Sequence, residues 1–489
     1  MSTIAEYDDW DATRMAALVA KKQVSPQELL TEAMARADAR NPAINAVVLR
    51  QDDTARQMIT AGLPQGPLHG VPFLLKDLGA EAVAFPSHNG SKLLANTHYP
   101  RNSAIYERLA AAGLVTFGRT TSPEGGIGAA TESAVYGGPT RNPWHFDHTP
   151  GGSSGGSGAA VAAGIVPAAH GSDGGGSVRI PASSCGLFGF KPTRARLPDG
   201  PYAGEGWAGM AIDGFLTRSV RDTALLLDVT EGADLGAPYY APPLSESFCA
   251  ALERPPLRLR VAMCDTTLTG APLHPDCRRA VHETAALLEH MGHSVTPALP
   301  RADINGMMLA WTKIVACGTA LWIEKTLAAR GTALGQDEIE GVARGAMAYA
   351  ATISGADYLD AVGKIHSFGR QMARFFDGDS SNGFDILLTA TLAEPPAKIG
   401  RFAHTTQDYV AYRTGPDGIF AYSPFCAAFN ASGQPAASVP LHWNDHGLPV
   451  GVHLAAPFGQ DTQLMALCSA LETAKPWFHR RPALATAPL

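Results

Sequence analysis

Short apolar runs alternate with helix-forming segments along this 489-residue chain, and this alternation is the strongest constraint on its fold. Residues 71–75, 114–117 and 385–389 are predicted to be strands, because apolar stretches of about four to eight residues are typical of buried strands. Between the first two, Ile105 and Leu109 recur at helical spacing. Strands that alternate with helices predict an α/β fold with a mainly parallel or mixed sheet.

Helix-capping residues mark the start of two helices, and a third region is helical in its overall residue pattern. Ser25 is predicted to cap a helix that begins at Pro26, and Glu28 completes a capping box. Ser219 is predicted to cap another helix. Residues 300–375 are Ala/Gly-rich and largely helical in pattern, so we expect them to lie over the core as an insertion.

Charge and cysteine content restrict the class of protein. The net charge of −7 and the isoelectric point near 6.1 argue against a nucleic-acid or anionic-membrane partner. Seven cysteines without a C-x-x-C pair indicate reduced thiols in the cytoplasm and no metal site. The N-terminus is acidic, unlike a signal peptide, and no run of about 18 apolar residues predicts a membrane span.

Two Gly/Ser runs, at residues 151–158 and 171–177, carry the main chemical signal. Such runs are often flexible linkers. Both runs here are followed by apolar, core-like sequence, which favours ordered turns in which glycines permit positive φ and close approach of a ligand. Ser177 stands 24 residues after Ser153, so the two turns present one serine each.

Lys76 ends the apolar run at residues 71–75. Burial disfavours the charged form of a lysine, and a neutral amine can act as a base. The alternative is a lysine that leaves the strand end for water. A base, two serines and the backbone N–H groups of Gly174, Gly175 and Gly176 would together suffice for amide hydrolysis, with the glycine loop stabilising the oxyanion.

Two other interpretations of the Gly/Ser runs have less support. Neither run ends in Gly-Lys-Ser/Thr, so a phosphate-binding P-loop is not indicated. Residues 152–156 match G-x-S-x-G, the nucleophile elbow of α/β-hydrolases, but a loop-like segment precedes them where that elbow needs a strand. His442, His446 and His453 could complete such a triad, although they are better explained as turn and strand residues.

Beside the two Gly/Ser runs and their 24-residue spacing, the chain has motifs at residues 70–77, 140–144, 179–182, 189–193, 385–389, 429–436 and 447–451. In these motifs, taken together, the chain resembles the amidase signature family, whose members use a Ser–cis-Ser–Lys triad. The resemblance implies the amidase-signature fold, with a large mixed central sheet covered by helices on both faces. It also implies one domain, without a cofactor, that acts on a small amide.

The family's roles transfer to matching residues. The resemblance implies Ser177 as acyl-forming nucleophile, Ser153 as proton relay after a cis peptide bond, and Lys76 as base. Gly174, Gly175 and Gly176 would form the oxyanion hole, together with the N–H of Ser177. The residues expected to support the two loops are Ser154, Asp173 and Arg179. The expected domain spans residues 1–489, with an N-terminal helical segment (1–65), the signature core (66–230) and the helical insertion near the substrate pocket (about 300–375).

Departures from the family pattern affect the substrate rather than the triad. Gly174 stands where Thr or Ile is commonest, and this smaller loop is similar to that of a branch that hydrolyses nylon oligomers. The expected reaction is hydrolysis of a non-peptide carboxamide. An esterase or carbamate hydrolase, and a glutamyl-tRNA amidotransferase-type subunit, remain alternatives, and a homodimer is left open. The candidate substrate contacts are Gly126, Ile127, Cys317 and Asn430.

Overall fold

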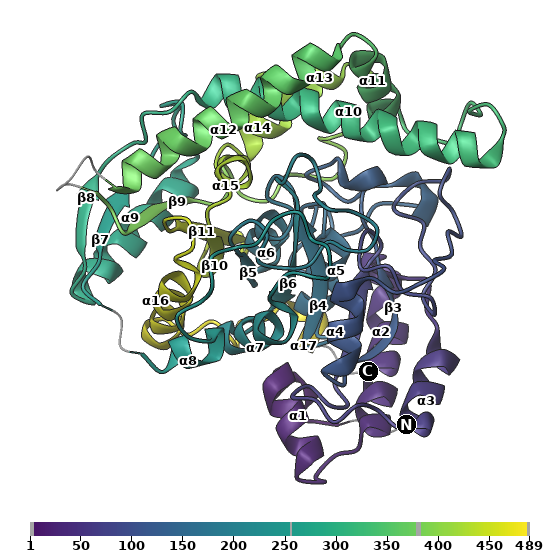
Figure 1. Cartoon of the computed structure of the whole chain (residues 1–489). Coiled ribbons are helices and arrows are strands. Elements are labelled where there is room, and N and C mark those ends of the chain that lie inside the picture. The colour runs from purple at the N-terminus through teal and green to yellow at the C-terminus, as the bar shows by residue number, and fades with distance from the viewer. Residues whose placement is uncertain (1–3, 255–256, 378–382, 487–489) are drawn as a thin grey trace.

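An eleven-stranded sheet runs through the computed structural model, which describes residues 4–254, 257–377 and 383–486 (Figure 1). The strand order is β1-β3-β2-β4-β6-β5-β10-β11-β9-β7-β8. Parallel and antiparallel pairs both occur, which confirms a mixed sheet. The strands are β1 (Val47–Val48), β2 (Pro72–Lys76), β3 (Val115–Thr120), β4 (Ala168–Asp173), β5 (Phe188–Lys191), β6 (Ile212–Thr217), β7 (Arg260–Met263), β8 (Ser294–Pro297), β9 (Ile386–Ala390), β10 (Ala436–Trp443) and β11 (Pro449–Ala455).

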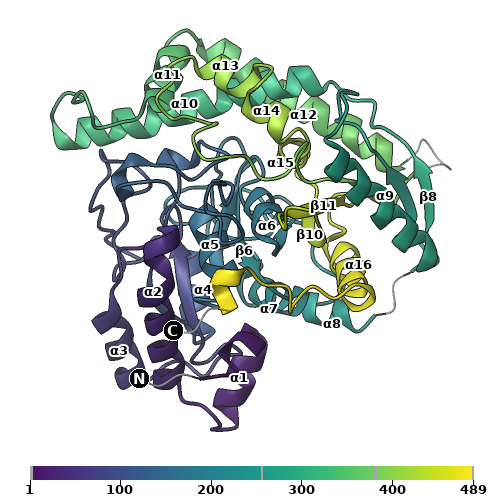
Figure 2. The same cartoon turned by 180° about the vertical axis from the view of Figure 1, so that it is seen from behind.

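Helices cover this sheet and form a further layer along one side of the molecule. In both views α10, α11 and α12 run along the side opposite α1, α2 and α3 (Figures 1 and 2). The helices are α1 (Ala12–Ala20), α2 (Pro26–Ile44), α3 (Asp52–Ala61), α4 (Ala104–Ala111), α5 (Gly155–Ala162), α6 (Arg179–Cys185), α7 (Val220–Thr230), α8 (Phe248–Leu252), α9 (Pro275–His290), α10 (Ile304–Arg330), α11 (Gly341–Ala350), α12 (Gly355–Asp377), α13 (Tyr409–Thr414), α14 (Ile419–Tyr422), α15 (Cys426–Ser432), α16 (Asp461–Ala474) and α17 (Ala483–Thr486).

The pairing of β2 with β4 positions the site. These strands are parallel, with Leu74 opposite Ala169, so their carboxyl ends lie at the same edge of the sheet. Lys76 is the last residue of β2, and Asp173 ends β4 immediately before the Gly174–Ser177 loop. Parallel pairing therefore brings the lysine to the glycine loop although about a hundred residues separate them in sequence.

Helix α5 is made of small residues because it is buried on every side. All eight residues from Gly155 to Ala162 are buried, and the helix packs against β2, β4 and α6. A Cβ on Gly156 would lie 2.4 Å from the backbone nitrogen of Thr121, a distance that real side chains do not adopt. The first Gly/Ser run therefore forms the start of α5, where the neighbouring backbone leaves room only for small residues.

Strand β4 does not include the apolar residues at 165–167 that precede it. It begins only at Ala168 and continues to Asp173. The Ile165 N–H is used by the end of α5, where it donates to Ala160 O after Gly164 turns the chain with φ +68°. The strand instead includes the start of the second Gly/Ser run, because β6 pairs with it along its whole length.

Helix α10 is long and apolar enough to cross a membrane by length and composition, and it is the one such helix in the described ranges. Its most apolar 18-residue stretch has a mean hydropathy of 1.4, and 61% of that stretch is buried within the protein. The helix packs against α11, α12, α13 and α15, which accounts for its apolar face. The absence of a membrane partner stays a prediction.

Candidate active site

Lys76 lies fully buried at the end of β2 and contacts two serines. Its Nζ lies 2.7 Å from Ser153 Oγ and 2.8 Å from Ser172 Oγ. Burial lowers the pKa of Lys76 to about 7, although the charges of Asp213 and Asp173 act in the opposite direction. A large fraction of this amine is therefore neutral near pH 7 and able to accept a proton.

Ser153 sits in a turn whose backbone admits no side chain before it. The Gly152–Ser153 peptide bond is cis, as the resemblance implied. A Cβ on Gly152 would lie 2.7 Å from Gly128 O and 2.8 Å from the backbone of Ala129 and Ala130. The close approach of these two backbone segments fixes the position of Ser153, which is 2% exposed.

Ser177 is half-buried and shares a cavity with Ser153 and Ser172. The cavity has a volume of about 620 Å³. The two serine loops are joined directly, because the Ser154 N–H donates to Ser177 O at 3.2 Å. Ser154 Oγ also lies 3.2 Å from the Ser172 nitrogen and 3.3 Å from Ser172 O, which supports the loop from its other end. Ser153, Ser172 and Ser177 thus face one space, and Lys76 contacts the first two of them.

The glycine loop offers fewer free donors than the sequence indicated. Gly176 N–H donates to Asp173 Oδ1 at 2.7 Å, so it is not available to an oxyanion in this structure. The N–H groups of Gly174, Gly175 and Ser177 donate to no acceptor within the described residues. These three groups are the remaining candidates for the oxyanion hole.

Asp173 and Arg179 form a fully buried ion pair that holds the loop. Arg179 Nε and Nη2 donate to the two Asp173 oxygens, each at 2.9 Å. Burial alone would raise the pKa of Asp173, but the adjacent Arg179 charge holds it well below its usual range. Asn430 closes the cluster, since its Nδ2 donates to Asp173 O at 2.9 Å and its Oδ1 accepts from Arg179 at 2.7 Å.

Two tryptophans explain why the loop has a third glycine. A Cβ on Gly174 would lie 2.5 Å from the ring of Trp207, and one on Gly175 would lie 2.9 Å from the ring of Trp311. Trp311 Nε1 donates to Gly174 O at 3.0 Å. Trp207 itself has φ +50°, a left-handed conformation that is rare for a bulky residue. The rings occupy the space that a larger residue would need.

The predicted substrate contacts separate into one that lines the cavity and three that do not. Gly126 lines it, and a Cβ there would lie 3.4 Å from Ser153 Oγ. Ile127 is buried behind it and Asn430 is held by Asp173 and Arg179. Cys317 lies on the part of α10 near Tyr349 of α11, whose pKa is raised by burial and by that thiol. None of these three is among the residues that line the cavity.

Ser172 is a contact of Lys76 that the sequence did not indicate. Its signal was its position one residue before Asp173 in an alternating strand, which places the two side chains on opposite faces. A second such contact is His170, whose Nδ1 accepts from the backbone N–H of Lys76 at 3.3 Å. His170 Nε2 lies 3.2 Å from Asp213 Oδ1, so this pair stands directly behind the base.

The histidines of the alternative triad lie away from both serines. His442 contacts Glu283 and Thr284, and His453 contacts Arg179. His446 is exposed in the turn before β11. None of the three lines the serine cavity, and no strand directly precedes the 152–156 turn. The structure therefore gives no support to a Ser-His arrangement among these residues.

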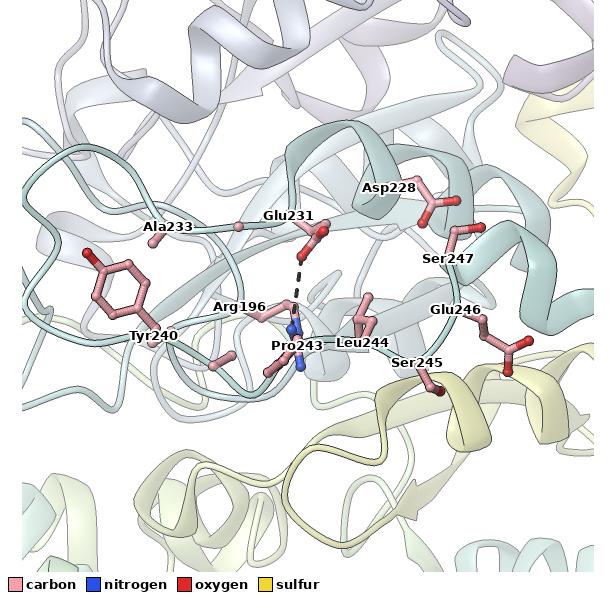
Figure 3. Close-up of a pocket in the computed structure, with 13 residues that line it drawn as sticks. Arg196, Asp228, Glu231, Ala233, Tyr240, Pro243, Leu244, Ser245, Glu246 and Ser247 are labelled. Carbon is pink, nitrogen blue, oxygen red and sulfur yellow. Dashed lines mark ion pairs between the residues drawn. The ribbon is translucent and has the colours of Figure 1, made fainter.

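A second cavity, of about 640 Å³, lies elsewhere and has a polar lining (Figure 3). Arg196 and Glu231 face each other across it at 4.0 Å, and Arg196 is also 3.4 Å from Asp461. Neither Lys76 nor either predicted catalytic serine lines it. No group of three metal-binding side chains occurs in the described part of the chain. The chemistry above therefore belongs to the serine cavity.

Comparison with known proteins decides the family. The family model described as Amidase matches residues 28–465. The chain belongs to the amidase family. A 6-aminohexanoate-cyclic-dimer hydrolase of Paenarthrobacter ureafaciens is 35% identical over 98% of each chain. An acylamidase of Rhodococcus erythropolis is 34% identical over 96% of this amidase and 97% of its own length.

Solved structures agree with the sequence comparison. A 6-aminohexanoate cyclic dimer hydrolase superposes with a TM-score of 0.91 at 35% identity, covering 97% of this amidase and 99% of that chain. A bacterial aryl acylamidase of the amidase signature family superposes with a TM-score of 0.86 at 29% identity, covering 98% and 99%. The predicted family and fold class are confirmed, and this amidase is a hydrolase of carbon–nitrogen bonds other than peptide bonds.

Proposed function

We propose that this amidase hydrolyses a non-peptide carboxamide through an acyl-enzyme on Ser177, with Ser153 as proton relay and Lys76 as base. One observation carries the proposal: a fully buried lysine lies 2.7 Å from Ser153 Oγ, and Ser153 shares its cavity with Ser177. The buried amine has water excluded around it, so its proton exchange is directed to the serine hydroxyls.

The proposed cycle has two halves. Neutral Lys76 accepts a proton from Ser153, which takes one from Ser177 as the Ser177 oxygen attacks the amide carbonyl. The proton then returns through Ser153 to the leaving nitrogen as the C–N bond breaks. Water attacks the resulting ester by the same relay, which releases the carboxylic acid and restores the Ser177 hydroxyl.

The rest of the site supports this cycle electrostatically. The N–H groups of Gly174, Gly175 and Ser177 would stabilise the negative oxygen of each tetrahedral intermediate. Ser172 would hold the lysine amine through its contact at 2.8 Å. Asp173, Arg179 and Asn430 would fix the loop without touching the reacting atoms.

We also propose that the enzyme is cytoplasmic and acts on a small molecule without a cofactor. Its seven cysteines are all unpaired, which suits a reducing compartment. The overall acidic charge disfavours a tRNA-linked partner.

A hydrolysis screen of amides, anilides, carbamates and esters tests the proposed function. We expect Ser177→Ala and Lys76→Met to lose activity by about a thousandfold or more on every substrate that the wild type cleaves. Ser245→Ala is the matched control, because Ser245 is exposed beside the second cavity and should keep wild-type activity. Near-wild-type kcat in either triad variant would exclude the assigned roles.

A further inference from the structure

Arg413 of α13 is a buried cation without an acidic partner. The residue is 3% exposed, its Nε has no hydrogen-bond partner among the described residues, and none of their ion pairs includes it. Its guanidinium instead lies over the rings of Trp311, Tyr409 and Tyr412, with its Cζ 5.1–5.4 Å from their centroids. Burial of an unpaired charge is costly. Packing alone therefore does not account for an arginine at this position.

One contact of Arg413 leads to the relay serine. Arg413 Nη2 donates to the backbone oxygen of Ile127. The neighbours of Ile127 on both sides pack against the turn that carries Ser153. A Cβ on Gly126 would lie 3.4 Å from Ser153 Oγ, and Gly128 O packs against the backbone of the glycine before that serine. By holding Ile127 O, Arg413 therefore fixes the backbone that surrounds the relay hydroxyl.

A second contact leads to the nucleophile. The Trp311 ring on which Arg413 rests, at 5.1 Å, also supports the glycine loop. Trp311 Nε1 donates to Gly174 O at 3.0 Å, and a Cβ on Gly175 would lie 2.9 Å from the ring. Arg413, Trp311 and Ser177 line one small space of about 20 Å³. Arg413 thus contacts the supports of both serine loops.

We infer that Arg413 is a positioning residue that fixes the two serine loops relative to each other, so that Ser153 can take the proton of Ser177. The inference rests on the proposed function, because that cycle passes a proton between these two serines. An arginine suits this task, since its planar guanidinium can donate to a carbonyl while its face rests on a ring. A neutral side chain lacks the charge, and a lysine lacks the planar face.

Arg218 offers a matched control in the same protein. It is 6% exposed and, like Arg413, belongs to none of the ion pairs of the described residues. It donates to the backbone oxygens of Asp8 and Trp10, each at 2.7 Å, and lies over the Phe478 ring at 4.5 Å. It lines neither the serine cavity nor the small space beside the nucleophile. Its removal therefore repeats the loss of a buried arginine away from the site.

Steady-state kinetics on an uncharged amide compare Arg413→Ala with Arg218→Ala, after circular dichroism has shown that both are folded. In Arg413→Ala, kcat should fall about a hundredfold with KM nearly unchanged, because a displaced relay slows proton transfer. Arg218→Ala should keep kcat within about twofold of the wild type. Arg413→Lys keeps the charge and a donor, so its kcat should fall only about tenfold, and it serves should the alanine variant not fold.

Added methylguanidine separates positioning from folding. It should raise the kcat of Arg413→Ala about tenfold by occupying the vacated site, and should leave Arg218→Ala unchanged. Wild-type kcat in Arg413→Ala or in Arg413→Lys, an equal loss in Arg218→Ala, or no recovery with either methylguanidine or lysine would overturn the inference and leave the proposed function intact. Wild-type activity in Ser177→Ala would instead overturn the proposed function.

Discussion

At the scale of single residues, the chemistry depends most on the protonation of Lys76. Burial lowers the pKa of Lys76 to about 7, and the Asp213 charge works against that shift. Asp213 reaches the base region through His170, whose Nε2 lies 3.2 Å from the carboxylate. Burial therefore lowers the pKa of Lys76, and the nearby Asp213 charge limits how far it falls.

The first prediction concerns pH. Below about pH 7 Lys76 is protonated and cannot accept the relayed proton, so kcat/KM should fall about tenfold per pH unit on the acid side. Asp213→Asn removes a charge that stabilises the ammonium, so it should move this acid limb to lower pH. The measurement is kcat/KM of an uncharged amide from pH 5 to pH 9.

The control for this profile is Asp385→Asn, which removes a carboxylate whose ion pair with Arg260 lies outside the site. Its acid limb should match that of the wild type. An Asp213→Asn limb that moves to higher pH would contradict the electrostatic argument. A profile without any acid limb would remove Lys76 from the role of base.

The second prediction concerns Gly174. A Cβ on Gly174 would lie 2.5 Å from the Trp207 ring, which already occupies that space. Gly174→Ala should therefore destabilise the protein by about 1–3 kcal/mol and lower kcat. Adding Trp207→Leu should recover part of that stability, and a double-mutant cycle by chemical denaturation measures the coupling. Strictly additive effects of the two changes would show that the ring does not explain the glycine.

At the scale of elements, two strand ends and one helix start form the site. Strand β2 supplies Lys76, β4 supplies Ser172 and Asp173, and α6 begins with Arg179 directly after the nucleophile loop. Helix α15 contributes Asn430 from the far end of the sequence. The loop thus depends on contacts between elements that are distant along the chain.

The third prediction concerns the ion pair between these elements. Arg179→Met leaves the Asp173 carboxylate buried without its partner, so it should lower the free energy of unfolding by about 3–5 kcal/mol. It should also reduce kcat, because Asp173 holds Gly176. Arg278→Met, which breaks an exposed pair with Asp265, should cost less than about 1 kcal/mol in the same denaturation experiment. Equal losses in the two variants would contradict the assigned support.

Local sequence signals predicted the elements whose cause is local. The helix that begins at Pro26 forms with its capping box, since Ser25 Oγ accepts from the Glu28 N–H and Glu28 accepts from the Ser25 N–H. The α7 helix begins after Ser219 as expected. Strand β2 ends at Lys76, one residue beyond the apolar run that predicted it. In each case the residues that set the boundary are neighbours in sequence.

The sequence could not predict features that depend on distant partners. Strand β4 continues through Gly171 because β6 pairs with it, although glycine there indicates a turn. Gly176 N–H is taken by Asp173, which local reasoning treated as a separate support. Trp207 reaches the loop from residues 199–211, a segment without helix or long strand whose path no periodicity reveals.

At the scale of the whole molecule, α10, α11 and α12 form a layer along one side (Figure 1), and α10 contributes to the active site. Trp311 and Trp322 both come from α10: Trp311 lines a small space beside Ser177, and Trp322 lines the serine cavity. A Cβ on Gly125 would lie 3.2 Å from the Trp322 ring, so the core approaches this helix closely. That residues 300–375 are an insertion remains a prediction, but α10 within this region supplies two aromatic side chains beside the serines.

The fourth prediction concerns this layer. Trp322→Ala removes an aromatic wall of the serine cavity and none of the three residues assigned to the proposed cycle, so it should raise KM for an anilide roughly tenfold while kcat changes little. Steady-state kinetics on an anilide and on acetamide measure the effect. Leu321→Ala is the control, because Leu321 is 51% exposed on the same helix and does not line the serine cavity. A tenfold loss of kcat with unchanged KM would contradict a purely binding role.

The proposed chemistry depends on acylation of Ser177, and mass spectrometry detects this acylation directly. Wild-type enzyme quenched during turnover of a short-chain anilide or ester should carry the mass of the acyl group on the peptide that contains Ser177. The Ser177→Ala enzyme should carry none. An adduct on Ser153, or steady consumption of substrate without any adduct on Ser177 even with an ester that deacylates slowly, would contradict the proposed function.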